Sequence, residues 1–402
     1  MEIKTIKQFY QSVEKELFEN IISFWLNNTK DEEKGGFYGR ISNDLHIDKN
    51  AHKSLILNAR ILWTFSHLYD FRAKPEYMEI AQLAYSYIKK HFYDTQYGGM
   101  FWMVDCDGKV ISDKKKMYGQ AFSIYALSAF YAITNDPQIL GEAVEIFNLV
   151  EKHNYDKKNK GYFETSNRDW TIAEDLRLSE VDMNEMKSMN THLHLMEAYT
   201  FLYKVWPDAR LKQKLIDLIH VFQTHILDSK THHFKLFFDD EWRSKSKAVS
   251  FGHDIEGSWL LCEATDALND EDLQKQIRLL AIDMAKTTAL EGLSDRYTIY
   301  TERNGDGAIY NKSDWWQQAE MIVGFVNAFE ISKDEYFLNL AVRCWQAVEE
   351  YFIDQENGEW FYEIDAKGQP EMKQYKISEW KGPYHNGRAC IELLERLKPY
   401  SR

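Results

Sequence analysis

Three segments far apart in the chain place a histidine beside polar or aromatic side chains at helical spacing. In the first, MNTHLH at residues 189–194, Asn190 and His194 are four residues apart and share one face of a helix. His192 lies on a different face, so the two histidines diverge and we do not expect them to share a metal ion. For an isolated histidine of this kind, burial in the core is the favoured explanation.

The second segment, SFGHDIEGSW, spaces His253, Glu256 and Trp259 three residues apart near the expected start of a helix. One helix face then offers an imidazole that can move a proton, a carboxylate, and an indole on which a sugar ring can stack. Helix capping combined with core packing explains the same pattern equally well. The pattern alone therefore leaves a catalytic role open.

The third segment, EWKGPYHNGR, contains Trp380, Tyr384, His385 and Arg388. Its Gly-Pro pair breaks the chain directly before a final helix that we expect over residues 388–397. These four side chains are too polar and too bulky to be filler before an apolar helix. We therefore favour a functional role, with His385 exposed at the junction of loop and helix.

Four further residues could contact a ligand. Arg60 lies within the apolar run LILNARILWTF, where a charge needs a partner or a ligand, and Tyr118 lies at the start of another apolar run. Trp316 and Glu320 are four residues apart, so an indole and a carboxylate can grip the two sides of a sugar. Tryptophans at such spacing more often pack in a core.

A repeated turn indicates how these residues are positioned. A glycine beside aromatic residues recurs about every 60–70 residues, strongly in three places and weakly in three more. These turns contain Gly36, Gly99, Gly161, Gly307 and Gly358, and the fourth, which begins at His233, has the aromatic residues without a glycine. Six units of this length each have room for two helices and their connections.

The segments between the turns read as helices of two kinds. Residues 55–68, 120–133 and 254–268 are apolar, whereas 76–91 and 138–153 are amphipathic with charged faces. Alternating buried and amphipathic helices predict an all-α fold: an (α/α)6 barrel with short β-hairpins and loops on one rim, formed by one domain over residues 1–402. An open α-solenoid is the alternative.

The net charge, the cysteines and the absence of known motifs limit the kinds of ligand and partner that we expect. The formal charge of −14 argues against nucleic acid and against an anionic membrane. The four scattered cysteines and the absence of a signal-peptide pattern indicate a cytoplasmic protein. Phosphate-binding, dinucleotide-binding, serine-hydrolase and zinc-protease motifs are absent, so we expect no cofactor and no metal. We expect a monomer.

The chain resembles the N-acylglucosamine 2-epimerase superfamily, and within it the branch that acts on disaccharides. The matching stretches span almost the whole sequence and include FWLNNTKDEEKGGFYGR, LILNARILWTFS, KMYGQAF, MNTHLHLMEAY, SFGHDIEGSWLL, DWWQQAE and EWKGPYHNGRACIE. The last of these is the most specific. The resemblance also implies the (α/α)6 barrel.

Carried over residue by residue, the resemblance implies that His253 and His385 transfer protons and that His194, not His192, is the third active-site histidine. The residues that it assigns to substrate binding, with Asn190 added from the face of His194, are Arg60, Tyr118, Asn190, Glu256, Trp259, Trp316, Glu320, Trp380 and Arg388.

The implied activity is that of an isomerase: reversible inversion at C2 of the reducing-end glucose of a β-1,4-linked disaccharide, cellobiose or lactose. Aldose–ketose isomerisation, or 2-epimerisation of mannose or N-acylglucosamine, is the nearest alternative. An inverting glycoside hydrolase would need two opposed carboxylates rather than histidines. A sugar-binding protein without activity would have no need of three histidines around one sugar.

Overall fold

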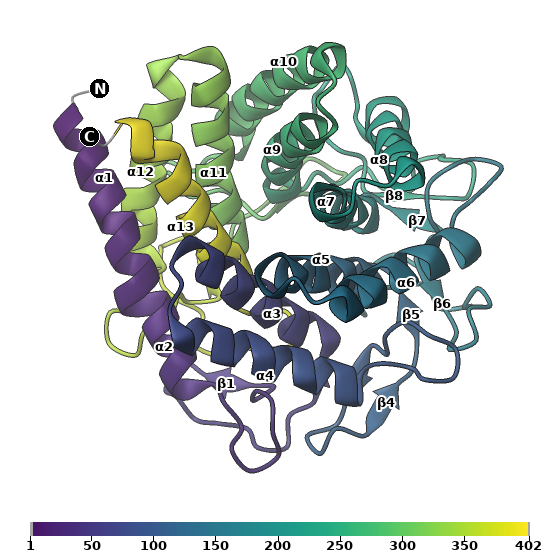
Figure 1. Ribbon diagram of the computed structural model, residues 1–402. Coiled ribbons are helices and arrows are strands. Elements are labelled where there is room, and N and C mark those ends of the chain that lie inside the picture. Colours follow the sequence, from purple (N-terminus) through teal and green to yellow (C-terminus); the bar gives the residue numbers. More distant parts are fainter. Residues whose placement is uncertain (1–2, 401–402) are drawn as a thin grey trace.

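Six inner helices form a closed ring in the computed structural model, which describes residues 3–400 (Figure 1). They are α3 (Leu55–Phe71), α5 (Met117–Thr134), α7 (Met189–Val205), α9 (Phe251–Leu268), α11 (Trp315–Ser332) and α13 (Tyr384–Leu397). Each inner helix contacts the next, and α13 contacts α3. This last contact closes the ring, so the predicted (α/α)6 barrel is confirmed and the open solenoid is excluded.

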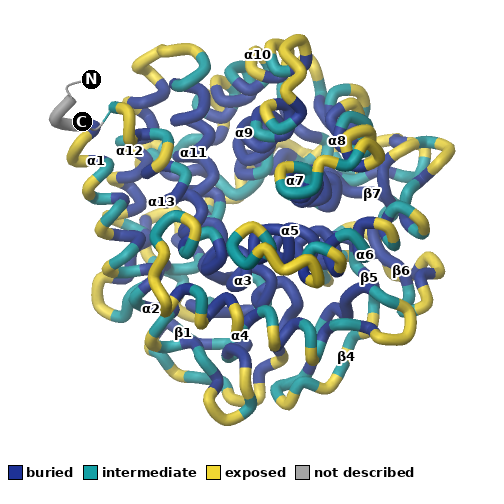
Figure 2. The backbone as a smooth tube through the Cα atoms, in the orientation of Figure 1, coloured by how far each residue is buried: buried dark blue, intermediate teal, exposed yellow. Residues whose placement is uncertain are grey.

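An outer ring of helices surrounds the inner one. It consists of α1 (Ile3–Lys15) and α2 (Ile22–Asn28), joined by a π-helical segment over Glu16–Ile21, together with α4 (Pro75–His91), α6 (Pro137–His153), α8 (Ala209–Val221), α10 (Glu271–Thr287) and α12 (Glu335–Tyr351). The amphipathic outer helices bury one face and expose the other, whereas the inner helices are buried along most of their length (Figure 2). No helix of residues 3–400 is long and apolar enough to cross a membrane.

Short antiparallel strands connect neighbouring units at one end of the barrel. The pairs are β1 (Ile41–Ser42) with β13 (Tyr375–Ile377), β5 (Lys115–Lys116) with β6 (Thr165–Ser166), β7 (Lys187–Ser188) with β8 (Phe237–Phe238), β9 (Glu302–Arg303) with β10 (Ile309–Tyr310), and β11 (Ser313–Asp314) with β12 (Glu363–Ile364). A three-stranded sheet contains β2 (Lys53–Ser54), β3 (Met103–Val104) and β4 (Val110–Ser112). Several strands end directly where an inner helix begins, and so hold its first turn.

The six repeated turns lie where expected, with one correction. Each is closed by a single antiparallel bridge, and the bridges are Lys30 to Phe37, Tyr93 to Met100, Tyr155 to Tyr162, Leu227 to Phe234, Leu293 to Ile299, and Ile353 to Trp360. The fifth turn is therefore at 293–299, and the prediction at Gly307 was wrong. Gly307 instead lies between β9 and β10, which form an additional hairpin.

Buried ion pairs tie four of the turns to the inner helices. A lysine located two residues before the inner helix, or in β13 for the last unit, donates to an aspartate in the turn. The pairs are Lys53–Asp31 at 2.7 Å, Lys115–Asp94 at 3.0 Å, Lys187–Asp156 at 2.8 Å and Lys376–Asp354 at 2.6 Å. Val249 and Ser313 occupy the matching positions before α9 and α11. The repeat is thus visible in individual contacts as well as in the helices.

Candidate active site

Equivalent positions of the inner helices supply most of the predicted site residues. Their second residues include Tyr118, Asn190, Trp316 and His385, and their sixth residues include Arg60, His194, Glu256 and Glu320. Second and sixth residues are four apart and therefore share one helix face. In α9 the second residue is Gly252, and His253 follows it. The first two turns of the inner helices therefore lie together at one end of the barrel.

A cavity of about 280 Å³ lies at this end of the barrel. Nine of the twelve predicted site residues line it: Arg60, Tyr118, Asn190, His194, His253, Glu256, Trp316, Trp380 and His385. The remaining three, Trp259, Glu320 and Arg388, are fully buried and do not line the cavity. Glu320 accepts from His385, Arg388 donates to Glu256, and Trp259 donates to Glu320, so these three residues lie behind the residues of the wall.

His253 lies in the first turn of α9, half-buried against an indole. Its ring centroid is 4.7 Å from that of Trp316, and the Ser250 hydroxyl oxygen is 2.7 Å from its Nδ1. Burial, with the nearby His194, lowers the pKa of His253 to about 3. The imidazole is therefore neutral at pH 7 and able to accept a proton.

His385 is held by a carboxylate instead. Its Nδ1 donates to Glu320 at 2.6 Å, and its Nε2 accepts from the Arg60 guanidinium at 3.3 Å. Burial and the positive charges of Arg60 and Arg388 lower the pKa of His385 in the free protein. The helix α13 begins at Tyr384, one turn earlier than expected, so His385 lies on the helix itself.

His194 and His192 lie in different surroundings, and their side chains diverge as the helical spacing predicted. His194 lines the cavity, and its Nδ1 lies 2.8 Å from the Glu197 carboxylate. His192 is completely buried: its Nδ1 donates to the Ser188 carbonyl at 2.6 Å, and its Nε2 accepts from the Tyr162 amide at 2.9 Å. Both nitrogens of His192 are thus bound to backbone, which leaves it no ligand role.

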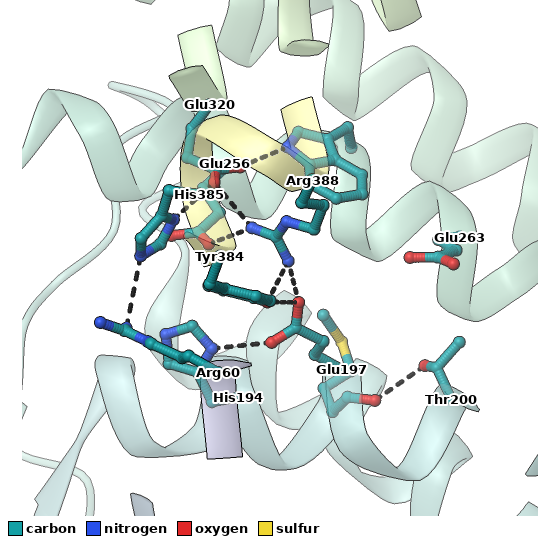
Figure 3. A network of polar contacts seen from close by, with 12 residues as sticks. Arg60, His194, Glu197, Thr200, Glu256, Glu263, Glu320, Tyr384, His385 and Arg388 are labelled. Atoms are coloured by element: carbon teal, nitrogen blue, oxygen red, sulfur yellow. Dashed lines mark hydrogen bonds and ion pairs between the residues drawn. The ribbon is translucent and has the colours of Figure 1, made fainter. Parts of the chain in front are cut away.

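A buried ion network lies behind the cavity (Figure 3). The Nη2 of Arg388 donates to Glu256 at 2.9 Å and to Glu320 at 2.7 Å, and its Nη1 contacts Glu197 and Tyr384. Sequence analysis did not find Glu197, although it is only three residues after His194. Glu256, Glu320 and His385 could geometrically surround a metal ion, but the Arg388 guanidinium already bridges both carboxylates.

Other groups remain available to a ligand. The amide oxygen of Asn190 and one carboxylate oxygen of Glu256 have no hydrogen-bond partner among the described residues, although both residues line the cavity. Arg60 donates to the Tyr118 hydroxyl at 2.9 Å, and burial raises the pKa of Tyr118 to about 12. These groups offer donors and acceptors to sugar hydroxyls or to a negatively charged oxygen.

A second cavity of about 520 Å³ adjoins the first. Both are lined by Trp380 and by Leu178, Ser179 and Val181 from the loop between β6 and β7. Trp102 lines the second cavity, and its ring centroid is 5.8 Å from that of Trp380. This loop and the cavity wall formed by Trp315 and Tyr362 were not found from the sequence.

Known proteins resemble this chain over nearly its whole length. The chain is 44% identical to the cellobiose 2-epimerase of Bacteroides fragilis, over 96% of this chain and 98% of that protein, and 38% identical to that of Ruminococcus albus, again over 96% and 98%. The solved cellobiose 2-epimerase of Bacillus thermoamylovorans superposes with a TM-score of 0.93 at 38% identity, covering 97% of this chain and 99% of that one.

The family model for N-acylglucosamine 2-epimerase (GlcNAc 2-epimerase) matches residues 36–387, which include every predicted site residue except Arg388. The identities with the two cellobiose 2-epimerases extend over 96% of the chain. The chain belongs to the N-acylglucosamine 2-epimerase family.

Proposed function

We propose that this chain is an isomerase that reversibly inverts C2 of the reducing-end glucose of β-1,4-linked disaccharides, converting cellobiose to glucosylmannose and lactose to epilactose. The observation that carries the proposal is the placement of two histidines from different helices against one indole. The ring centroids of His253 and His385 lie 4.7 and 5.5 Å from that of Trp316. A sugar held at this indole is within reach of both imidazoles.

The chemistry requires two such groups. The hemiacetal must open before the C2 proton becomes acidic, because only the open aldehyde can delocalise the resulting charge as an enediolate. Inversion then needs proton removal from one face of C2 and proton delivery to the other. In the glucose-to-mannose direction His253 is the base and His385 the acid, and the roles reverse on return.

The surroundings of the two histidines suit these roles. His253 is neutral beside a hydroxyl, so it can accept the C2 proton. Glu320 stabilises the imidazolium of His385, and the charge that develops on the enediolate increases its proton affinity further. After turnover His253 loses its proton to solvent and His385 regains one, so the enzyme returns to its starting state. His385 or His194 assists ring opening and closure.

The enediolate oxygens need positive or hydrogen-bonding groups. Arg60, with Tyr118 and His194, lines the cavity beside His385 and supplies them. Asn190 and Glu256 offer free oxygen atoms to sugar hydroxyls. The adjoining cavity, reached past Trp380, has room for the second sugar of a disaccharide.

We further propose that residues 1–402 act as one catalytic domain and work as a monomer in the cytoplasm. Three of the four cysteines are buried and all four are free, which suits a reducing compartment.

Proton NMR of cellobiose incubated with the protein in D2O tests the reaction. We expect a mannose-type anomeric signal and deuterium only at C2 of the reducing-end sugar. Ketose signals would reassign the chain as an aldose–ketose isomerase, and free glucose would indicate a hydrolase. Turnover of mannose or N-acylglucosamine with none of cellobiose or lactose would overturn the disaccharide substrate and keep the two-histidine chemistry.

A further inference from the structure

Glu197 occupies a buried position between two parts of the site. It lies on α7, one turn beyond His194, and is 3% exposed. One carboxylate oxygen is 2.8 Å from His194 Nδ1, and the other contacts both the Tyr384 hydroxyl and the Arg388 guanidinium. Figure 3 shows this carboxylate between His194 and Arg388. Every oxygen of Glu197 is therefore engaged.

The contact with His194 determines which ring nitrogen carries the proton. A carboxylate accepts hydrogen bonds, so Nδ1 of His194 is the protonated nitrogen and Nε2 is the acceptor. Because His194 lines the cavity, this tautomer decides what the histidine can do toward a sugar oxygen. Metal-site histidines are oriented by carboxylates in the same way.

The contact with Arg388 extends the effect to the second proton-transfer residue. Arg388 donates to Glu320 at 2.7 Å, and Glu320 accepts from His385 Nδ1 at 2.6 Å. Glu197, Arg388 and Glu320 thus form one buried chain of contacts with a histidine at each end. All three side chains are at most 3% exposed, so water does not replace these bonds.

We propose that Glu197 is a positioning residue, which sets the tautomer of His194 and, through Arg388, the placement of the Glu320 carboxylate that holds His385. This inference rests on the proposed epimerisation. Glu197 does not line the cavity and is not expected to contact the substrate. Its loss should therefore lower kcat while changing KM little.

Two substitutions test separately the charge and the length of the side chain at position 197. Glu197→Gln removes the negative charge from beside Arg388, whereas Glu197→Asp keeps the charge but shortens the side chain by one methylene. We expect both to lower kcat for cellobiose about 10- to 100-fold, with KM within about threefold of the wild type, as for other residues that orient functional histidines. Glu197→Asp should lower the Tm less, because Arg388 keeps a buried counter-charge.

Glu263→Gln is the matched control. Glu263 lies on α9 and pairs with Lys204 at 2.5 Å, away from the three cavity histidines (Figure 3). The Glu263→Gln substitution removes the carboxylate charge from an ion pair that does not contact His194, His253 or His385. We expect its kcat to stay within about threefold of the wild type.

Nitrogen-15 NMR of histidine-labelled protein measures the tautomer without any turnover. The His194 signals, assigned with a His194→Gln sample, should show a protonated Nδ1 in the wild type and a mixture of tautomers in Glu197→Asp. An unchanged tautomer, or a kcat for both Glu197 variants like that of Glu263→Gln, would overturn the inference. If wild-type protein fails to epimerise cellobiose, the proposed function fails, and the tautomer measurement still decides the role of Glu197.

Discussion

The imidazole of His385 donates through Nδ1 to the carboxylate of Glu320 at 2.6 Å. The corresponding nitrogen of His253 lies 2.7 Å from the uncharged Ser250 hydroxyl. The two proposed proton-transfer residues therefore differ in the charge of the group that holds them. A carboxylate stabilises an imidazolium and a hydroxyl does not, so an imidazolium that forms during the reaction is better stabilised at His385 than at His253.

This difference predicts that the two halves of the reaction can be separated. His385→Asn should lower epimerisation of cellobiose about 10²- to 10⁴-fold, the usual contribution of a general acid or base. Exchange of the C2 proton with D2O should fall much less, because His253 can remove a proton and return a deuteron to the same face. Proton NMR follows both processes in one sample. Equal loss of exchange and epimerisation would show that one histidine does not suffice for the first half.

A second prediction concerns His192 and His194. Gln120 and Gln318 occupy the position of His192 in α5 and α11, and each accepts from a turn amide at 2.9 Å, as His192 does. His192→Gln should therefore fold and retain activity within about threefold, whereas His194→Gln should lower kcat by about tenfold or more. A steady-state assay of the two variants, with circular dichroism as the folding control, checks this. Equal activity of the two would contradict the assignment.

The buried histidines should also make stability depend on pH. Burial lowers the pKa of His192 to about 3, below its value in the unfolded chain, so the unfolded state binds more protons between these values. The contribution of His192 to the free energy of unfolding should be fully present above about pH 6.5 and decrease as the pH falls. Between pH 7 and pH 5 the loss should be about 2 kcal/mol. Urea unfolding of wild type and His192→Gln at both pH values measures this contribution. An equal loss in the two proteins would contradict it.

Trp380 should affect disaccharides more than monosaccharides, because it lines both cavities. Its carbonyl accepts from Arg60, and that contact survives truncation of the side chain. Trp380→Ala should raise KM for cellobiose about tenfold or more through loss of stacking area. The KM for free glucose or mannose should change less, and Trp380→Phe should keep most of the affinity. An equal increase in KM for disaccharides and monosaccharides would indicate that Trp380 contacts only the reacting sugar ring.

The buried lysines of the turns should matter for folding. Lys53 is 1% exposed and donates to Asp31 at 2.7 Å and to the Gly35 carbonyl at 2.8 Å. Lys53→Met leaves a buried carboxylate unpaired and should cost about 3–5 kcal/mol. Lys49→Met is the control, because its exposed pair with Glu33 should contribute less than about 1 kcal/mol. Denaturant unfolding of the two variants distinguishes these values, and similar losses would contradict the role of Lys53.

The sequence predicted the barrel because turn and helix patterns recur locally. It failed at the fifth turn, where residues 293–299 carry no glycine–aromatic pair while the nearby hairpin at Gly307 does. Helical spacing grouped Asn190 with His194 and His253 with Glu256, and the family resemblance assigned the roles of the histidines and of most cavity residues. Glu197 was not, because its importance depends on Arg388, which lies 191 residues away in the sequence. Trp259, Glu320 and Arg388 were expected at the substrate but lie behind the cavity wall.

The use of equivalent helix positions has a consequence for how this barrel can be altered. The fourth residue of three inner helices accepts a hydrogen bond from a turn, whereas seven of the second and sixth residues named above line the cavity. The residues that hold the turns are therefore different from those that line the cavity. Phe122, the sixth residue of α5, is apolar and packs 4.9 Å from His194. A different side chain at Phe122 would therefore change the surroundings of His194 while leaving every residue that holds a turn in place.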